Sequence, residues 1–314
     1  MGNVRLSVVI PAYNEQEVLE ETYKRLKGVM DGMGGSYELV FVNDGSKDKT
    51  SEMLFDLHKR DSAVKVVEFA RNFGHQIAVT AGLDYATGDA IVIIDADLQD
   101  PPEAIPEMVK LWEQGYEVVY GKRLKRKGES IFKKLTAHMF YRFLSGVSTT
   151  KIPLDTGDFR LIDKKVADVM RSMKEGNRFL RGMVAWAGFN QTAYEYVRDE
   201  RFAGETKYPL KKMLKLSADG IASFSSKPLS MSLWLGVIMM VLSVLYFIAT
   251  IVLRAVGVAM AAWNYAAAAI LLSNSLILVA IGIVGVYLGR VYDEAKARPI
   301  YIVGKAYGFD TGKE

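Results

Sequence analysis

Two carboxylates at the end of an apolar run are the residues of this sequence best suited to chemistry. The stretch IVIIDADLQDPP, residues 91–102, begins with β-branched residues typical of a buried strand and then carries Asp95 and Asp97. Because side chains alternate along an extended chain, these two carboxylates point to the same side, and Ala96 points to the other. Two like charges this close repel unless a cation lies between them or water screens them. A divalent ion, Mg²⁺ or Mn²⁺, would bind both carboxylates and leave positions for phosphate oxygens.

A second interpretation of the same stretch stays open. Acidic residues are common just before helices, so Asp95 and Asp97 could belong to a solvated turn that caps a helix beginning near Pro101 and Pro102. The apolar residues that precede the two acids favour the metal site, because they place the acids at the end of a buried strand.

The elements that must position these acids alternate in type along the chain. Residues 1 to about 225 alternate short apolar runs with charged, helix-compatible stretches. Such alternation is typical of an α/β fold with a doubly wound, mainly parallel sheet. We expect strands within residues 5–15, 37–46, 64–74 and 89–99, and helices within residues 17–30, from 46 or 48 through 57, and 77–87.

The carboxyl ends of these strands are the expected ligand site. In open sheets of this kind, ligands bind in the crevice beyond that edge. The polar residues that follow the four predicted strands are Tyr13, Asn14, Glu15, Asn43, Asp44, Arg71, Asn72, Asp95 and Asp97.

Other chemistries are excluded by what the sequence lacks. None of the 314 residues is cysteine, which rules out disulfides and thiolate metal sites and is compatible with a cytoplasmic location. The histidines, His58, His75 and His138, lack metal-ligand spacing. Neither the G-x-S-x-G elbow nor the glycine-rich dinucleotide and phosphate loops occur. The net charge of +4 and the lack of a basic tract argue against nucleic acid as a partner.

Two long apolar runs predict a membrane location. Ser232–Leu253 and Tyr265–Leu288 contain no acidic or basic side chain, and a bilayer is crossed by about 20 such residues. Cations flank the pair on its outer sides, so both termini are expected in the cytoplasm and the protein is expected to be a multi-pass protein of the cytoplasmic membrane. A buried helical hairpin in a water-soluble protein is the alternative. The predicted domains are residues 1–228, a two-helix transmembrane hairpin at 229–289, and a cytoplasmic tail at 290–314.

Stretches near residues 130–148 and 207–226 combine apolar stripes with lysine and arginine. Basic amphipathic helices of this kind lie at membrane surfaces, where they contact membrane lipid; ordinary helices facing the core are the alternative. Small residues in AAAAILLSNS and GIVGVYLG allow close helix packing, so we expect a homo-oligomer.

A series of motifs in order along the chain carries a family resemblance. They are VVIPAYNE, VNDGSKDKT, ARNFG, DADLQDPPE, GKR, DTGDFRL, RFAGETKYP and YLGRVYDEAKARP. From Leu6 to about Ile302, the chain resembles the polyprenyl-phosphate glycosyltransferases of the inverting GT-A type. It is most similar to bactoprenol glucosyltransferases, and more distantly to dolichyl-phosphate mannose synthases and aminoarabinose undecaprenyl transferases.

The resemblance implies transfer of a single sugar, with inversion, from a nucleotide-sugar such as UDP-glucose to polyprenyl (undecaprenyl) phosphate at the cytoplasmic membrane face. It also implies a Mg²⁺ or Mn²⁺ ion held by Asp95 and Asp97, with Asp97 contributing to catalysis. Asn43 departs from members that have an acid pair at this position. The resemblance assigns the nucleotide-sugar to Pro11, Tyr13, Glu15, Asp44, Arg71, Asp95 and Gln99, and the phosphate oxygens of donor or lipid to Lys122, Arg123, Arg201 and Lys207.

Asp158, in DTGDFR, is the residue that the resemblance implies as catalytic base. The second pKa of the attacking phosphate is about 6, so the phosphate is already largely anionic at neutral pH and little proton removal is required. Asp158 could therefore orient the acceptor, or pair with Arg160, as much as it accepts a proton. A purely structural Asp158–Arg160 brace remains an alternative.

Two other functions stay open from the sequence. One is a membrane-anchored, non-catalytic protein that binds a nucleotide-sugar and recruits a partner. The other is a processive polysaccharide synthase, which would need more membrane spans to build a channel. The presence of Asp95, Asp97 and Asp158 favours the enzyme that transfers one sugar.

Overall fold

The computed structural model describes residues 5–124, 156–176, 178–197 and 262–309, with a few isolated positions between 238 and 256. Two of the predicted phosphate-binding residues, Arg201 and Lys207, lie outside the described residues. The amphipathic stretches predicted near 130–148 and 207–226 also lie outside them. The chain divides into two compact units, one made of residues 1–146, 150–216 and 299–314 and the other of residues 147–149 and 217–298.

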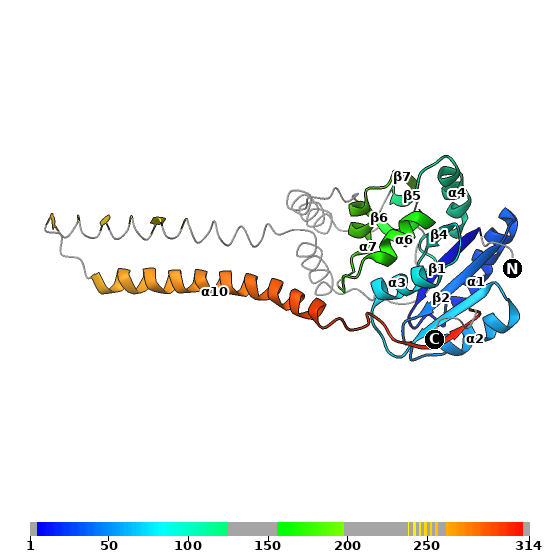
Figure 1. The fold of residues 1–314 in the computed structure, drawn as a ribbon, viewed down its shortest axis with the longest axis horizontal. Helices are drawn as coiled ribbons and strands as arrows, with labels where there is room; N and C mark the ends of the chain where they lie inside the picture. Colours follow the sequence, from blue (N-terminus) through cyan, green and yellow to red (C-terminus); the bar gives the residue numbers. More distant parts are fainter. Residues whose placement is uncertain are drawn as a thin grey trace. The chain divides into compact units, whose positions relative to one another are not determined.

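An eight-stranded sheet forms the first unit, in the order β7-β5-β6-β4-β1-β2-β3-β8 (Figure 1). Its central strands β4, β1, β2 and β3 are parallel, whereas β6 and β8 run antiparallel to their neighbours β4 and β3. The predicted mainly parallel α/β fold is therefore confirmed. The strands are β1 (Leu6–Ala12), β2 (Tyr37–Asn43), β3 (Val64–Phe69), β4 (Ala90–Ile93), β5 (Val118–Arg123), β6 (Thr156–Asp163), β7 (Gln191–Tyr196) and β8 (Val303–Tyr307).

Helices follow the strands and cover the sheet (Figure 1). Strand β1 is buried at every position, as expected for a central strand with both faces covered. Helix α1 buries one stripe, Leu19, Thr22, Leu26 and Met30, whose spacing matches one face of a helix. The helices of this unit are α1 (Leu19–Met33), α2 (Thr50–Arg60), α3 (His75–Tyr85), α4 (Ile105–Glu113), α6 (Lys164–Ser172) and α7 (Leu180–Ala187), with the short helix η1 (Pro102–Ala104) before α4. Helix α10 (Ala262–Ala295) belongs to the second unit.

Helix α3 lies close against β1 because Gly82 has no side chain. A Cβ at this position would be 2.1 Å from Cγ1 of Val9, a buried residue of β1. This close approach sets where the N-terminus of α3 lies, at the carboxyl edge of the sheet. The residues at that N-terminus, His75 and Gln76, therefore reach the same edge as the predicted site.

The C-terminal segment adds a strand that the sequence reading did not predict. Strand β8 pairs with β3 in antiparallel register, with Val66 opposite Tyr307 and Val67 opposite Ala306. It covers the edge of the sheet next to β3, which would otherwise expose unpaired backbone groups.

The two predicted membrane-spanning helices are not confirmed. Most of Ser232–Leu253 lies outside the described residues, and Tyr265–Leu288 forms part of α10, which continues to Ala295. Within the part of the chain that the structure describes, no helix combines the length and apolarity needed to cross a membrane. The prediction of a multi-pass protein in the cytoplasmic membrane was therefore wrong. It was made from the absence of acidic and basic side chains in the two runs and from the cations that flank them, whereas a membrane span requires length and apolarity together. The homo-oligomer stays a prediction.

Candidate active site

Asp95 and Asp97 follow strand β4 at the carboxyl edge of the sheet. Asp95, Asp97 and Gln99 are partly accessible, whereas Ala96 and Leu98 are buried, so burial alternates along this stretch although β4 itself ends at Ile93. The loop after β4 is anchored to α1, because the hydroxyl of Thr22 donates a 2.7 Å hydrogen bond to the Ala96 carbonyl. The backbone N–H of Gln99 donates to Asp97 Oδ1 at 3.2 Å.

Asp95 and Asp97 alone would not complete a metal site. Among the residues that the structure describes, no group of three or more histidines, aspartates and glutamates is arranged to hold a metal ion. Mg²⁺ and Mn²⁺ are commonly bound by one or two carboxylates, with substrate phosphates and water as the other ligands. In chemistry, two partly accessible carboxylates fit such an ion together with a diphosphate.

Asp158 lies near the loop that carries Asp95 because strand β6 is antiparallel to β4. Ile93 pairs with Arg160, so the same register continued by two residues sets Asp158 beside Asp95. Residues far apart in sequence thus meet at the carboxyl edge of the sheet. Asp158 itself is nearly buried, at 8% exposure.

His75, the first residue of α3, lies between these two acids. Its Nε2 is 2.8 Å from Asp95 Oδ1, and its Nδ1 is 3.7 Å from Asp158 Oδ2. Burial lowers the pKa of His75, but the charges of Asp95 and Asp158 outweigh it and raise the pKa to about 9. Burial raises the pKa of Asp95, and His75 reverses this, so that the pKa lies below its ordinary value. The imidazolium neutralises part of the repulsion between the acids.

The carboxylate of Asp158 has Arg181 as its ion-pair partner. Arg181 Nε donates to Asp158 Oδ1 at 2.8 Å, and Gln76 Nε2 donates to Asp158 Oδ2 at 3.0 Å. Burial raises the pKa of Asp158, but Arg181 and His75 outweigh it and hold the pKa far below its ordinary value. Arg160, the partner considered from the sequence, instead donates to the backbone carbonyls of Gly157 and Asp158. Burial lowers the pKa of Arg160 to about 10.

Asp44, at the end of β2, organises the loop between β3 and α3. Its buried carboxylate accepts from the backbone N–H of Phe73 at 2.6 Å and of Gly74 at 2.9 Å, and from Asn72 Nδ2 at 2.9 Å. Burial raises the pKa of Asp44, and these backbone bonds oppose the rise. The next residue, Gly45, has φ +64, and a Cβ there would lie 2.5 Å from the Arg71 carbonyl carbon. The loop therefore closes tightly over the end of β2.

The loop after β1 is tied to the loop after β2. The backbone N–H of Asn14 donates to Ser46 Oγ at 2.9 Å, and the backbone N–H of Glu15 donates to Thr50 Oγ1 at 2.9 Å. Pro11 is buried within β1, whereas Tyr13 and Glu15 are partly accessible.

Arg71, in the loop after β3, is another of the predicted nucleotide-binding residues. It is exposed, and its guanidinium carbon lies 3.9 Å from the centre of the Phe73 ring. The structure thus brings the predicted residues of β1, β2, β3 and β4 to one edge, with Pro11 and Asp44 buried beneath the accessible ones.

Lys122 and Arg123 point in different directions, as neighbours on a strand do. Arg123 turns inward, where its Nη2 is 3.5 Å from Oδ1 of the buried Asp100 and its Nε donates to Tyr196 Oη at 3.3 Å. Lys122 forms a 2.7 Å ion pair with Glu195 on the surface. The structure therefore places Arg123, and not Lys122, beside the acidic loop.

His75, Gln76 and Arg181 are the site residues that sequence reasoning missed. His75 and Gln76 directly follow ARNFG, so their position after a strand and at the start of a helix was the available signal. Arg181 had no such signal, since it comes from α7 and reaches the site only through the tertiary fold.

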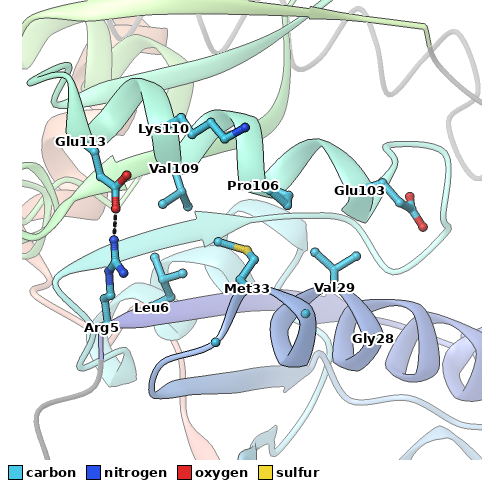
Figure 2. Close-up of a pocket in the computed structure, with 12 residues that line it drawn as sticks. Arg5, Leu6, Gly28, Val29, Met33, Glu103, Pro106, Val109, Lys110 and Glu113 are labelled. Atoms are coloured by element: carbon cyan, nitrogen blue, oxygen red, sulfur yellow. Dashed lines mark hydrogen bonds and ion pairs between the residues drawn. The ribbon is translucent and has the colours of Figure 1, made fainter.

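The cavity described in this structure lies elsewhere. It has a volume of about 540 Å³ between α1 and α4 and is lined by residues that include Leu6, Met33 and Val109. Figure 2 shows Arg5 and Glu113 facing each other across one end of it, where they form an ion pair. Arg5 and Leu6 stand at the start of β1, so this cavity lies at the edge of the sheet opposite the acids.

The chain is similar to several known proteins. The model of the family described as glycosyl transferase family 2 matches residues 7–171. The uncharacterised glycosyltransferase YkcC of Bacillus subtilis (strain 168) is 56% identical, over 98% of this chain and 96% of its own. The bactoprenol glucosyl transferase of Shigella phage SfX is 38% identical, over 96% of this chain and 99% of its own. The crystal structure of glucosyl-3-phosphoglycerate synthase from Mycobacterium tuberculosis with Mn²⁺, uridine diphosphate and glucosyl-3-phosphoglycerate is similar, with a TM-score of 0.45 and 22% identity over 70% of this chain and 78% of that one.

These matches decide between the enzyme and the non-catalytic binding protein that the sequence left open. The relatives cover nearly the whole chain, and the family match includes β1 through most of α6. The chain is therefore an enzyme, a glycosyltransferase, and it belongs to glycosyl transferase family 2.

Proposed function

We propose that this glycosyltransferase moves one hexose from a nucleotide-sugar to the phosphate of a polyprenol, with inversion at the anomeric carbon. The similarity to the phage bactoprenol glucosyl transferase supports both glucose and a polyprenyl acceptor, so UDP-glucose and undecaprenyl phosphate are the first substrates to test. The observation that carries the proposal is the meeting of Asp95 and Asp158 on either side of His75, at 2.8 and 3.7 Å.

Asp95 and Asp97 are the proposed ligands of a Mg²⁺ or Mn²⁺ ion. When bound, the ion acts as a Lewis acid that stabilises the negative charge of the departing nucleoside diphosphate. Both acids are partly accessible, and the hydrogen bond from Thr22 to the carbonyl of Ala96 fixes the backbone between them, which supports this role.

The nucleoside half of the donor is proposed to bind over Tyr13, Glu15 and Arg71. Asp44 helps to hold this surface in place, because its hydrogen bonds from the backbone N–H groups of Phe73 and Gly74 fix the loop that carries Arg71. Gln99 is proposed to contact the sugar diphosphate next to Asp97. Pro11 contributes shape beneath the loop, since it is buried in β1.

The acceptor phosphate is proposed to attack from the side of Asp158. One phosphate oxygen forms a bond to the anomeric carbon while the bond from that carbon to the diphosphate oxygen breaks. A direct displacement of this kind inverts the anomeric carbon, so an α-linked donor gives a β-linked lipid product. A phosphate largely ionised at neutral pH needs little proton removal, so Asp158 is proposed to orient groups in the acceptor half.

Cationic side chains are proposed to meet the phosphate oxygens, for which arginine is well suited. Arg123 is the described candidate nearest the acidic loop, through its 3.5 Å contact with Asp100. Lys122 would have to leave its surface ion pair with Glu195 to take part. Arg201 and Lys207 are proposed from the resemblance alone.

The test uses the purified full-length chain with undecaprenyl phosphate, Mg²⁺ or Mn²⁺ and a panel of nucleotide-sugars. We expect one hexose per lipid, identified by mass spectrometry, with release of one nucleoside diphosphate. A product carrying a chain of sugars would indicate a processive synthase. If no donor in the panel gives a glycolipid, the proposed acceptor is wrong.

A further inference from the structure

The carboxylate of Asp158 is held from two helices that come together only in the fold. Arg181, in the first turn of α7, donates through Nε to one carboxylate oxygen at 2.8 Å. Gln76, in the first turn of α3, donates to the other at 3.0 Å. Asp158 therefore joins strand β6 to α3 and α7 through both of its oxygens.

The orientation of the Gln76 amide is set by a third contact. Its Oε1 accepts a 3.0 Å hydrogen bond from the backbone N–H of Leu180, the residue before Arg181. Because the oxygen of the amide faces α7, the NH₂ group must face Asp158 and can only donate to it. Both partners of Asp158 are thus donors, and an ionised carboxylate satisfies them better than a protonated one.

An ionised Asp158 creates a problem for the acceptor. A phosphate with a charge of about −1.5 to −2 would be repelled by Asp95 and Asp158 unless a cation stood between it and them. Four cationic side chains lie near this point in the described structure: His75, Arg123, Arg160 and Arg181.

The four cationic side chains differ in how accessible they are to an acceptor phosphate. Arg160 is 4% exposed and bonds backbone carbonyls, and the side chain of Arg123 is 14% exposed and faces Asp100. The side chain of His75 is 28% exposed, but it lies between the two acids. The side chain of Arg181 is 25% exposed, and it is the most accessible of the three arginines. A guanidinium has five N–H donors in a planar fork, so it can bond a carboxylate along one edge and a phosphate along another.

We propose that Arg181 binds the acceptor phosphate and that Asp158 and Gln76 are positioning residues that aim it. This inference rests on the proposed function, which supplies the polyprenyl phosphate. It gives Asp158 a role other than proton acceptance: the carboxylate fixes the guanidinium, and the guanidinium offsets the charge that would otherwise repel the phosphate.

The kinetic test compares Arg181→Gln, Arg181→Lys and Gln76→Ala with the wild-type full-length protein. We expect Arg181→Gln to raise the KM for undecaprenyl phosphate at least tenfold while the affinity for the nucleotide-sugar stays within about threefold. Arg181→Lys keeps the charge without the fork, so it should recover part of the loss. Gln76→Ala should raise the acceptor KM by a smaller factor. Arg60→Gln is the matched control, because Arg60 pairs with Glu20 on the exposed surface of α2.

A binding test separates this inference from the proposed function. Calorimetric titration with farnesyl phosphate, farnesol and inorganic phosphate needs no turnover. We expect farnesyl phosphate to bind the wild-type protein and to bind Arg181→Gln at least tenfold more weakly. The affinity for farnesol should not change with the substitution. Binding of inorganic phosphate with the same dependence on Arg181 would identify a site for free phosphate instead of the lipid headgroup and would overturn the acceptor assignment.

Two outcomes contradict the role of Arg181. One is an unchanged acceptor KM in Arg181→Gln, together with unchanged binding of farnesyl phosphate. The other is an equal loss of donor and acceptor affinity, which indicates a structural role. If Arg181→Gln does not fold, the acceptor KM and the affinity for farnesyl phosphate are measured in Arg181→Lys instead. This variant keeps the charge and therefore the ion pair, and it loses only the planar fork of N–H donors. Failure of the wild-type protein to make glycolipid, with Arg181-dependent binding of farnesyl phosphate intact, would count against the proposed reaction and support the phosphate site.

Discussion

The hydroxyl of Tyr301 donates a 2.8 Å hydrogen bond to the carboxylate of Asp84, which lies 217 residues earlier in the chain. The Tyr301 ring also stacks on Phe69, with ring centres 5.2 Å apart. The rings of Phe69 and Phe73 are packed edge to face with their centres 5.5 Å apart, and Arg71 lies over Phe73. The C-terminal segment therefore supports, through three aromatic rings, the loop proposed to hold the nucleoside.

Replacement of Tyr301 should weaken both the fold and donor binding. Tyr301→Phe removes one hydrogen bond and should cost about 1 kcal/mol of unfolding free energy. Tyr301→Ala also removes the ring, so we expect about 2 to 3 kcal/mol and a several-fold weaker affinity for uridine diphosphate. Denaturant unfolding and calorimetric titration measure the two effects. Tyr292→Phe is the control, because Tyr292 is 63% exposed on α10; equal donor affinity in Tyr301→Ala and wild type would contradict the support role.

The acidic pair should control metal-dependent donor binding. Asp95→Asn or Asp97→Asn removes one proposed ligand, and we expect transfer to fall by about 100-fold or more because charge stabilisation of the leaving group is lost. Removal of divalent ions by a chelator should have a similar effect on the wild-type protein and little further effect on the variants. Transfer assays and titration of uridine diphosphate with and without Mn²⁺ check this. Glu107→Gln, on the exposed face of α4, is the control. If the affinity for uridine diphosphate depends neither on divalent ions nor on these substitutions, the proposed metal site is wrong.

The contact of α3 with β1 predicts opposite effects for two glycine substitutions. Gly82→Ala places a Cβ 2.1 Å from Val9, so we expect a loss of about 1 to 3 kcal/mol from overpacking, with lower activity because the N-terminus of α3 shifts. Gly28→Ala, within α1, has nothing within 4 Å of the added Cβ. It should leave activity unchanged and raise stability by up to about 1 kcal/mol. Thermal unfolding of both variants tests this, and a neutral Gly82→Ala would show that the helix moves freely.

Asp158 should stabilise the fold in a pH-dependent way. Its pKa in the folded chain lies far below the ordinary value of about 3.9, so its contribution is fully present above about pH 4 and is lost as the pH falls further. The difference in unfolding free energy between the wild type and Asp158→Asn should therefore be constant from about pH 7 to pH 5 and shrink below about pH 4. Urea titrations at a series of pH values measure it. A difference that grows on acidification would reverse the assigned direction of the pKa shift.

Much of the fold could be predicted because local pattern and tertiary role agree. Each of the first four strands is an apolar run, and each is followed by a polar turn, so their parallel pairing follows from the alternation. The acids at residues 95 and 97 could be identified for the same reason, since they stand where a buried strand ends. Strand β8 could not, because VGKAY has no strong periodicity and forms only by pairing with β3.

The membrane prediction shows where composition is insufficient. A charge-free run shows that a segment lacks acidic and basic side chains, whereas a membrane span requires sufficient length and apolarity together. In the described residues no helix meets that requirement.

The amino-acid sequence by itself determined the α/β class, the first four strands and the acidic pair after the fourth, because hydrophobic periodicity and strand-end chemistry are local properties. Only the tertiary structure decided which groups surround Asp158. Antiparallel pairing of β6 with β4 brings Asp158 beside Asp95, and helices α3 and α7 deliver His75, Gln76 and Arg181 to the same point. The contact of Gln76 with Asp158 alone joins residues 82 positions apart, and no local pattern encodes these contacts because they depend on sheet register and helix packing.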